Sequence, residues 1–216
     1  MTPAGKRREI LKWAEEGGHH IIEDDYDSEF RLSGKPVETL MSMDRTERVI
    51  YINTFSRSIA PSVRISYMVL PHRLADEFRS RLGFYSCTVP VFEQYTLAEF
   101  IAGGYFERHV NRMKTYCRKQ RDLLPSMLDG CGLSEICTVI GKDSGLHFIL
   151  KIDTDVPDCD LSAKALKAGL KLSFVSEHLH SDDRDFDHML IADYFQISHE
   201  KMKAFADLIA SAERET

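Results

Sequence analysis

The feature that most constrains the fold is a pair of apolar, β-branched segments joined by a short polar link. The segments cover residues 49–52 and 65–70, and the link between them contains Pro61. Apolar runs bounded by turn residues are typical of buried strands. The link is too short for a parallel crossover, which needs about a dozen residues or more and usually includes a helix. The sequence therefore predicts two neighbouring antiparallel strands.

Four polar residues lie at one end of this predicted hairpin. Thr54, Ser56 and Arg57 follow the first strand, and Arg64 comes directly before the second. Hydroxyl groups and guanidinium groups are suited to binding a dianion. We therefore expect an anion pocket at this strand end.

A second strand end carries acids and an aromatic residue. An apolar strand predicted at residues 21–23 runs into the sequence Glu-Asp-Asp-Tyr-Asp-Ser-Glu-Phe-Arg, which begins at Glu23. The segment 26–48 is long enough for a crossover, so this strand can lie parallel to the one at 49–52, with the carboxyl ends together. Open α/β sheets bind ligands at such ends. The alternative, which composition favours, is an acidic surface loop with its turn at residues 33–36.

The rest of the chain shows alternating helical and strand patterns. We expect helices at residues 6–16, 74–81 and 91–128, the last bent near Gly103 and Gly104, with a basic, solvated face between Arg108 and Arg121. An α+β segment opens near Gly130. Its predicted strands cover residues 138–140, 146–152, 170–175 and 189–191, and its predicted helices cover 161–168 and 198–212, the last capped by Ser198.

Composition excludes some classes of partner. The 216 residues carry a net charge of −6 with a pI near 5.8, which gives no support to a nucleic-acid-binding surface. No apolar run approaches the roughly 20 residues of a membrane span. The five cysteines form no C-x-x-C pair, which favours reduced thiols in a cytoplasmic protein. We expect no metal site, and the acidic loop with His178, His180 and His188 is more typical of a solvated segment.

Three blocks of sequence resemble a known family. They are residues 21–31, residues 54–61 together with Arg64 and residues 67–71, and residues 104–113. They resemble the aminotransferase-like domain of MocR-type regulators, which are bacterial GntR-class transcription factors fused to a fold-type I, pyridoxal-phosphate-dependent aminotransferase module. The resemblance covers essentially the whole chain, with weaker matches after Gly130, such as residues 144–148.

The resemblance implies roles for five residues around pyridoxal 5'-phosphate. Asp24 matches the carboxylate that pairs with the pyridine nitrogen and keeps the ring an electron sink. Tyr26 matches the phenol that hydrogen-bonds the 3-oxygen of the ring. Thr54 or Ser56, together with Arg64, matches the phosphate site.

One residue departs from the family pattern. The position after Thr-Phe-Ser is implied to be the lysine that forms the Schiff base with the cofactor, and here it is Arg57. A guanidinium stays protonated and cannot serve as an imine-forming amine, whereas a buried lysine can. The resemblance therefore implies that the cofactor is bound non-covalently or is absent, and that transaminase activity is lost.

The resemblance also implies an α/β architecture, the C-terminal part of a fold-type I transferase. Residues 1–90 are expected to form part of the large cofactor-binding domain, residues 91–129 a connecting helical region, and residues 130–216 a small α+β domain. Other sheet strands and the DNA-binding domain of the family precede the segment seen here, so the sheet is expected to have an uncovered face and to associate, as a homodimer or swapped assembly. We expect an amine or amino-acid effector, and no contact with nucleic acid or membrane from this chain.

Three functions stay open at this point. The first is the effector-binding domain of a transcriptional regulator. The second is a pyridoxal-phosphate-dependent class I/II aminotransferase acting on amino acids. The third is a fragment that binds no ligand.

Overall fold

The computed structural model describes residues 3–33, 38–143, 145–180 and 184–214. They form two compact units, Met1–Arg112 and Met113–Thr216. Most of the predicted turn at residues 33–36, and Ser144 in the family match, lie outside the described residues. Within them, no helix combines the length and the apolar character needed to cross a bilayer.

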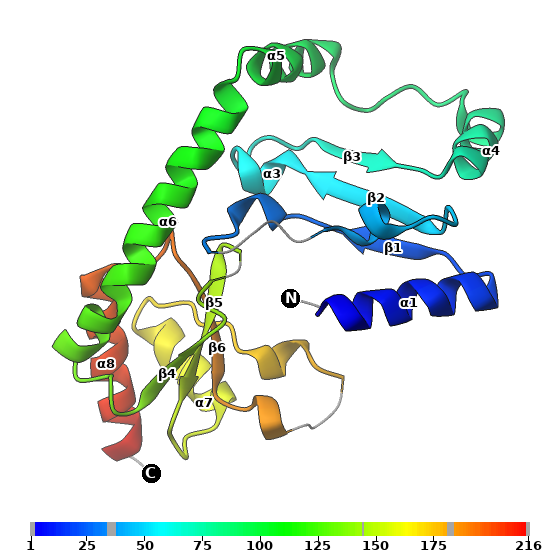
Figure 1. Cartoon of the computed structure of the whole chain (residues 1–216). Helices are drawn as coiled ribbons and strands as arrows, with labels where there is room; N and C mark the ends of the chain where they lie inside the picture. Colours follow the sequence, from blue (N-terminus) through cyan, green and yellow to red (C-terminus); the bar gives the residue numbers. More distant parts are fainter. Residues whose placement is uncertain (1–2, 34–37, 144, 181–183, 215–216) are drawn as a thin grey trace. The chain divides into compact units, whose positions relative to one another are not determined.

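The first unit contains one three-stranded sheet, in the order β1-β2-β3 (Figure 1). Strand β1 (Ile21–Asp24) pairs parallel with β2 (Val49–Thr54), and β2 pairs antiparallel with β3 (Ser66–Val69). Both predicted pairings are confirmed. The other elements are α1 (Ala4–Gly17), a 3-10 helix η1 (Ser28–Phe30), α2 (Leu40–Met43), α3 (Phe55–Ser58), α4 (His72–Leu82) and α5 (Val91–Ala102).

Local sequence explains where two helices stop. Helix α1 ends because Gly18 adopts a left-handed φ of 68°, which lets its N–H bond to the carbonyls of Ala14 and Glu15. The predicted break near Gly103 and Gly104 is confirmed: α5 ends at Ala102, Gly104 has a φ of 66°, and α6 (Tyr105–Gly130) begins after it. Helix α6 crosses the boundary between the two units.

The two faces of the first sheet differ in how far their side chains are exposed to solvent. The register places Asp24 beside Ile52, and Thr54 lies two residues further along β2, so all three side chains point to one face. Ile22 shares this face and is 67% exposed. The opposite face carries Asn53, which is 2% exposed. The described part of the chain therefore leaves the Asp24 face open and buries polar groups on the other.

The second unit contains an antiparallel sheet with the order β4-β5-β6. Its strands are β4 (Cys137–Ile140), β5 (His147–Ile152) and β6 (Met189–Asp193), and its helices include α7 (Asp158–Lys167) and α8 (His199–Arg214). Its core includes Phe148, Tyr194 and Phe205. Ser198 caps α8 as predicted, because its hydroxyl accepts the N–H of Lys201 at 3.2 Å.

The strand predicted at residues 170–175 is wrong over most of its length. Only one bridge, between Phe174 and Leu190, joins this segment to β6, together with a hydrogen bond from the Ile191 N–H to the Ser173 carbonyl. The chain then turns into a 3-10 helix, η2 (Val175–His178). A second short 3-10 helix, η3 (Arg184–Phe186), comes before β6.

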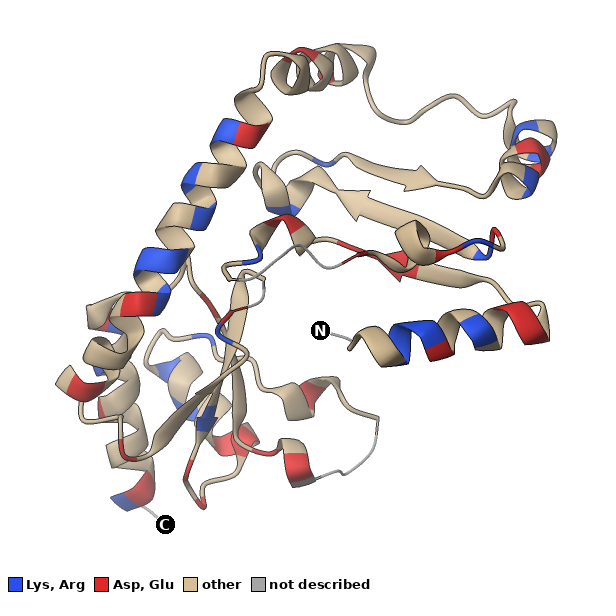
Figure 2. Ribbon diagram, viewed as in Figure 1, with Lys and Arg blue, Asp and Glu red and all other residues tan. Residues whose placement is uncertain are grey.

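Basic residues lie along helix α6, as Figure 2 shows. Arg108, Arg112 and Lys119 are exposed, as the sequence predicts for a solvated face. Arg121 differs: its guanidinium bonds to Asp122 and Asp143, and its side chain is only 19% exposed. At Arg121 the basic face is therefore mostly buried and ion-paired, and not solvated.

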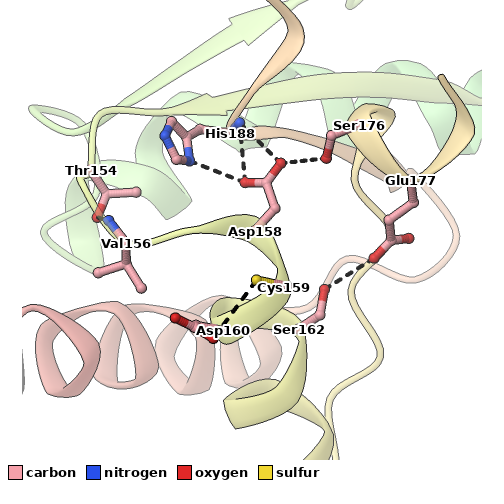
Figure 3. Close-up of polar contacts among 9 residues, drawn as sticks. All are labelled: Thr154, Val156, Asp158, Cys159, Asp160, Ser162, Ser176, Glu177 and His188. Atoms are coloured by element: carbon pink, nitrogen blue, oxygen red, sulfur yellow. Dashed lines mark hydrogen bonds and ion pairs between the residues drawn. The ribbon is translucent and has the colours of Figure 1, made fainter. Parts of the chain in front are cut away.

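His188 is also more constrained than a solvated loop predicts. Its backbone N–H and its Nδ1 both approach Oδ1 of Asp158, at 3.1 and 3.0 Å, and Oδ2 of Asp158 accepts the hydroxyl of Ser176 at 2.5 Å (Figure 3). His188 adopts a left-handed φ of 59°. Asp158, at the start of α7, thus holds both η2 and the residue before β6.

Candidate functional site: the β2–β3 end

The turn between β2 and β3 is built from hydroxyl groups that bond to backbone atoms. Thr54 Oγ1 accepts the N–H of Ser56 at 3.2 Å, so Thr54 caps the short helix α3. Ser56 Oγ donates to the carbonyl of Val63 at 2.6 Å. These contacts fix both hydroxyls at the carboxyl end of β2.

Arg64 reaches the same place from the other strand. Its Nη1 donates to Ser56 Oγ at 3.1 Å and approaches the Pro61 carbonyl at 3.5 Å, while the side chain stays exposed. The predicted convergence of Arg64 with the hydroxyls is therefore confirmed. An exposed guanidinium on a fixed hydroxyl presents donors that suit an anion arriving from solvent.

Arg57 does not take part in this cluster. Its side chain is exposed in α3, and among the described residues its guanidinium has no hydrogen bond or ion pair. Of the two guanidiniums predicted at this strand end, the described contacts bring that of Arg64 to the Ser56 hydroxyl. Successive residues of a helix point in different directions, so Ser56 faces Val63 while Arg57 faces solvent.

Asp24 and Tyr26 lie at the carboxyl end of β1. Asp24 pairs with Ile52 and shares the face of Thr54, and its side chain is exposed. Tyr26 follows the strand and is 41% exposed. The parallel pairing predicted from the crossover length thus brings an exposed carboxylate and a phenol to the end of the sheet that holds the hydroxyls.

Sequence reasoning missed a polar cluster on the opposite sheet face. Asp25, Glu29, Tyr51 and Asn53 are joined there by hydrogen bonds. Burial is the largest cause that raises the pKa of Tyr51 above its usual 10.0; Asp25 adds to this increase, and the hydrogen bond from Asn53 opposes it. The available signal was alternation: Asp25 follows Asp24 and so points to the other face.

An apolar pocket of about 310 Å³ also lies beside the turn. The link between α3 and β3 forms one wall and α5 forms the other; the lining residues include Ile59, Val63, Ile65, Phe92, Leu97 and Phe100. Phe92 is 81% exposed. This pocket offers packing area rather than polar chemistry.

The chain is similar to bacterial regulators in sequence. It is 42% identical over 171 residues to the HTH-type transcriptional regulator YdeL of Bacillus subtilis, a match that covers 79% of this chain and 37% of that protein. It is 34% identical over 180 residues to the probable rhizopine catabolism regulatory protein MocR of Rhizobium meliloti, covering 81% of this chain and 36% of that protein. The chain thus spans about a third of the length of these relatives. No protein-family model matches it.

Its fold is similar to that of solved aminotransferases. The kynurenine aminotransferase of Pyrococcus horikoshii superposes with a TM-score of 0.80 at 23% identity, covering 100% of this chain and 52% of that one. At this identity the likeness establishes the fold alone, which is the α/β fold of fold-type I transferases.

Proposed function

Because the chain resembles the aminotransferase-like domain of MocR-type, GntR-class transcriptional regulators, we propose that it is the effector-binding part of such a regulator and that it does not catalyse transamination. The effector we propose is an amine or amino acid that binds together with pyridoxal 5'-phosphate. The observation that carries the proposal is Arg57, which stands where the family places its imine-forming lysine.

The residues at this end of the sheet fit non-covalent binding of the cofactor. The Arg64 guanidinium, held 3.1 Å from Ser56 Oγ, keeps further N–H groups that it can offer to a phosphate. Asp24 offers a carboxylate to a protonated pyridine nitrogen, and Tyr26 offers a phenol to a ring oxygen. When bound, pyridoxal phosphate supplies an electron-withdrawing ring to an attached amine.

The residues present do not fit covalent attachment of the cofactor, because position 57 holds arginine and not lysine. A guanidinium offers no free amine, so the side chain at position 57 can neither attach to a carbonyl carbon nor act as the base that moves a substrate proton. The remaining residues bind and orient a ligand without transforming it. This division of roles favours a sensor over an amino-acid aminotransferase, which we keep as the second candidate because of the fold.

The test is to restore the amine. The protein and its Arg57→Lys variant are mixed with pyridoxal phosphate, reduced with borohydride, digested and weighed by mass spectrometry. We expect a cofactor adduct at position 57 in the variant alone. The Arg73→Lys variant, which adds a lysine on the exposed surface of α4, controls for unspecific labelling.

Two results would contradict the proposal. An adduct at position 73 as abundant as the one at position 57 would show that the turn offers no binding site. No adduct at position 57 in the Arg57→Lys variant would show that these residues do not hold the cofactor in this chain.

A further inference from the structure

Most of the acidic motif at the end of β1 has no part in the proposed function. Only Asp24 and Tyr26 are assigned to a ligand, although the motif extends from Glu23 to Phe30. The structure gives Glu23 a role in folding, because its carboxylate accepts the N–H groups of Leu40 and Met41 at 2.7 and 3.0 Å. Asp25 and Glu29 remain to be explained.

Asp25 fastens the motif to the central strand. Its N–H donates to the Ile52 carbonyl at 2.9 Å, which extends the β1–β2 ladder by one residue. Its carboxylate accepts the phenol of Tyr51 at 2.8 Å, and it also accepts the hydroxyl of Ser28 at 2.8 Å. Tyr26 therefore lies inside a turn whose first residue is tied to β2.

Asn53 is the centre of this arrangement. Its Nδ2 donates to the Tyr51 phenol at 3.0 Å and to Glu29 Oε1 at 3.2 Å, and its Oδ1 accepts the N–H of Thr54 at 2.5 Å. It is 2% exposed. Because a buried amide without partners is costly, these bonds hold Asn53 in a single orientation.

The contacts form one continuous path across the sheet. It begins at Asp25 and Glu29 in the motif, passes through Tyr51 and Asn53, and ends at the backbone of Thr54. We call these five residues the Asn53 network. Tyr51 donates to Asp25 and accepts from Asn53, and hydrogen bonds in such a chain strengthen one another.

We propose that the Asn53 network couples the two halves of the candidate site, so that Tyr51 and Asn53 are positioning residues for ligand binding. One half is the β1 end with Asp24 and Tyr26, and the other is the turn that Thr54 caps. The positioning role in ligand binding rests on the proposed function. The coupling between the two halves is a property of the protein without ligand. A shift of the motif alters the Tyr51 and Asn53 side chains and reaches the backbone N–H of Thr54.

The experiment removes one link and keeps the packing. Tyr51→Phe deletes the hydroxyl that joins Asp25 to Asn53 while the ring remains. We expect hydrogen exchange without ligand to become about tenfold faster in two separate segments, residues 24–29 and residues 54–58. The matched control is Tyr95→Phe, which deletes a hydroxyl on a side chain that is 70% exposed, and it should leave both segments unchanged.

A merely structural role for Tyr51 predicts something else. Faster exchange in residues 24–29 alone would show that the hydroxyl fastens only the motif, and the coupling would be wrong. Equal acceleration throughout α1 and all three strands would show a general loss of stability, and would also overturn it.

A ligand measurement separates this inference from the proposed function. In equilibrium dialysis with pyridoxal phosphate, we expect Tyr51→Phe to weaken binding at least fivefold, with the unfolding midpoint of the first unit, followed by Trp13 fluorescence, unchanged. Unchanged affinity would overturn the positioning role. If the unmodified protein binds no cofactor, the proposed function fails, and the exchange result alone decides the coupling.

Discussion

Asp44 shows how a single carboxylate can order a turn. Its two oxygens accept the N–H groups of Thr46, Arg48 and Val49, at 2.8, 2.6 and 2.8 Å. Glu47, inside this turn, has a left-handed φ of 56°. Burial alone would raise the pKa of Asp44, but these backbone donors outweigh it and hold the pKa below the usual 3.8. The turn places Val49, the first residue of β2, beside Ile21 of β1.

We predict that Asp44→Asn lowers the free energy of unfolding of the first unit by about 1–2 kcal/mol at pH 7, because the new amide faces N–H donors. A lowered folded-state pKa means that the stabilisation is fully present above about pH 3.8 and is lost as the pH falls through the lower folded value. The difference between the two proteins should therefore shrink below pH 3.8. Urea unfolding followed by Trp13 fluorescence at several pH values measures it.

The control for this prediction is Asp76→Asn. Asp76 pairs with Arg79 on the surface of α4, and both side chains are more than three-quarters exposed. Such pairs contribute little, so the control should change stability by less than about 0.5 kcal/mol. A pH-independent effect of Asp44→Asn would contradict the assignment.

Residues near in sequence were easier to predict than residues that meet across the sheet. The contact between Arg64 and Ser56 followed from the antiparallel pairing, because the hairpin returns Arg64 to the strand end it had left. The exposure of Arg57 was not predictable, because no sequence periodicity indicates the four-residue helix that carries it. Asn53 was missed because its partner Glu29 lies 24 residues away in the sequence, although alternation along β2 places Tyr51 and Asn53 on one face.

Among elements, α7, η2 and β6 depend on one residue. Asp158 binds Ser176 in η2 and both the backbone and the ring of His188 before β6 (Figure 3). Its side chain is 12% exposed. Glu177 adds a second tie, since it accepts the hydroxyl of Ser162 on α7 at 3.1 Å. The two ends of the intervening segment are thus attached to the same helix.

We predict that Asp158→Asn opens both ends together. Hydrogen bonds to a charged group contribute about 1.5–3 kcal/mol each, so the loss of one corresponds to at least tenfold faster exchange in residues 174–178 and 188–190. Hydrogen-exchange mass spectrometry measures this directly.

The control lies two residues away. Asp160→Asn removes the same charge from the first turn of α7, but Asp160 is exposed and contacts neither Ser176 nor His188. It should leave exchange in both segments unchanged. Acceleration in only one segment would show that Asp158 does not hold them jointly.

Element boundaries followed from local signals where glycine or a cap supplied one. The break near Gly103 and Gly104, where α5 ends, and the Ser198 cap of α8 were predicted from the sequence. The apolar run at residues 170–175 led to a wrong strand prediction. Phe174 is buried because it packs in the core, and the segment ends where η2 begins. The attachment of His188 to Asp158, thirty residues away, has no local signature.

At the scale of the whole molecule, the described chain exposes large apolar surfaces. Ile22 is 67% exposed on the open sheet face, and Phe92 and Tyr95 on α5 are 81% and 70% exposed. Strands β1 and β3 each have one neighbour among the described residues. Monomeric proteins rarely leave such surfaces bare, and open strand edges pair readily.

We predict that the chain associates in solution through its open sheet, as a dimer or a swapped assembly. Light scattering should give a mass well above that of one chain, and Ile22→Lys should shift the population toward monomer. Leu166→Lys is the matched control, because Leu166 is 71% exposed on α7 in the other unit. A strictly monomeric protein in dilute solution, or equal effects of the two variants, would contradict this prediction.

The fastening role of the motif has a consequence for how such chains evolve. Glu23 accepts the backbone N–H groups of Leu40 and Met41, while Asp25 and Glu29 bond to the Tyr51 and Asn53 side chains, and none of these contacts involves a cofactor. We therefore expect a chain of this kind to need these residues for folding whether or not it catalyses a reaction. A search keyed to this motif would then select for the fold and not for catalysis, and the residue at position 57 is the one that we propose to inspect for Schiff-base chemistry.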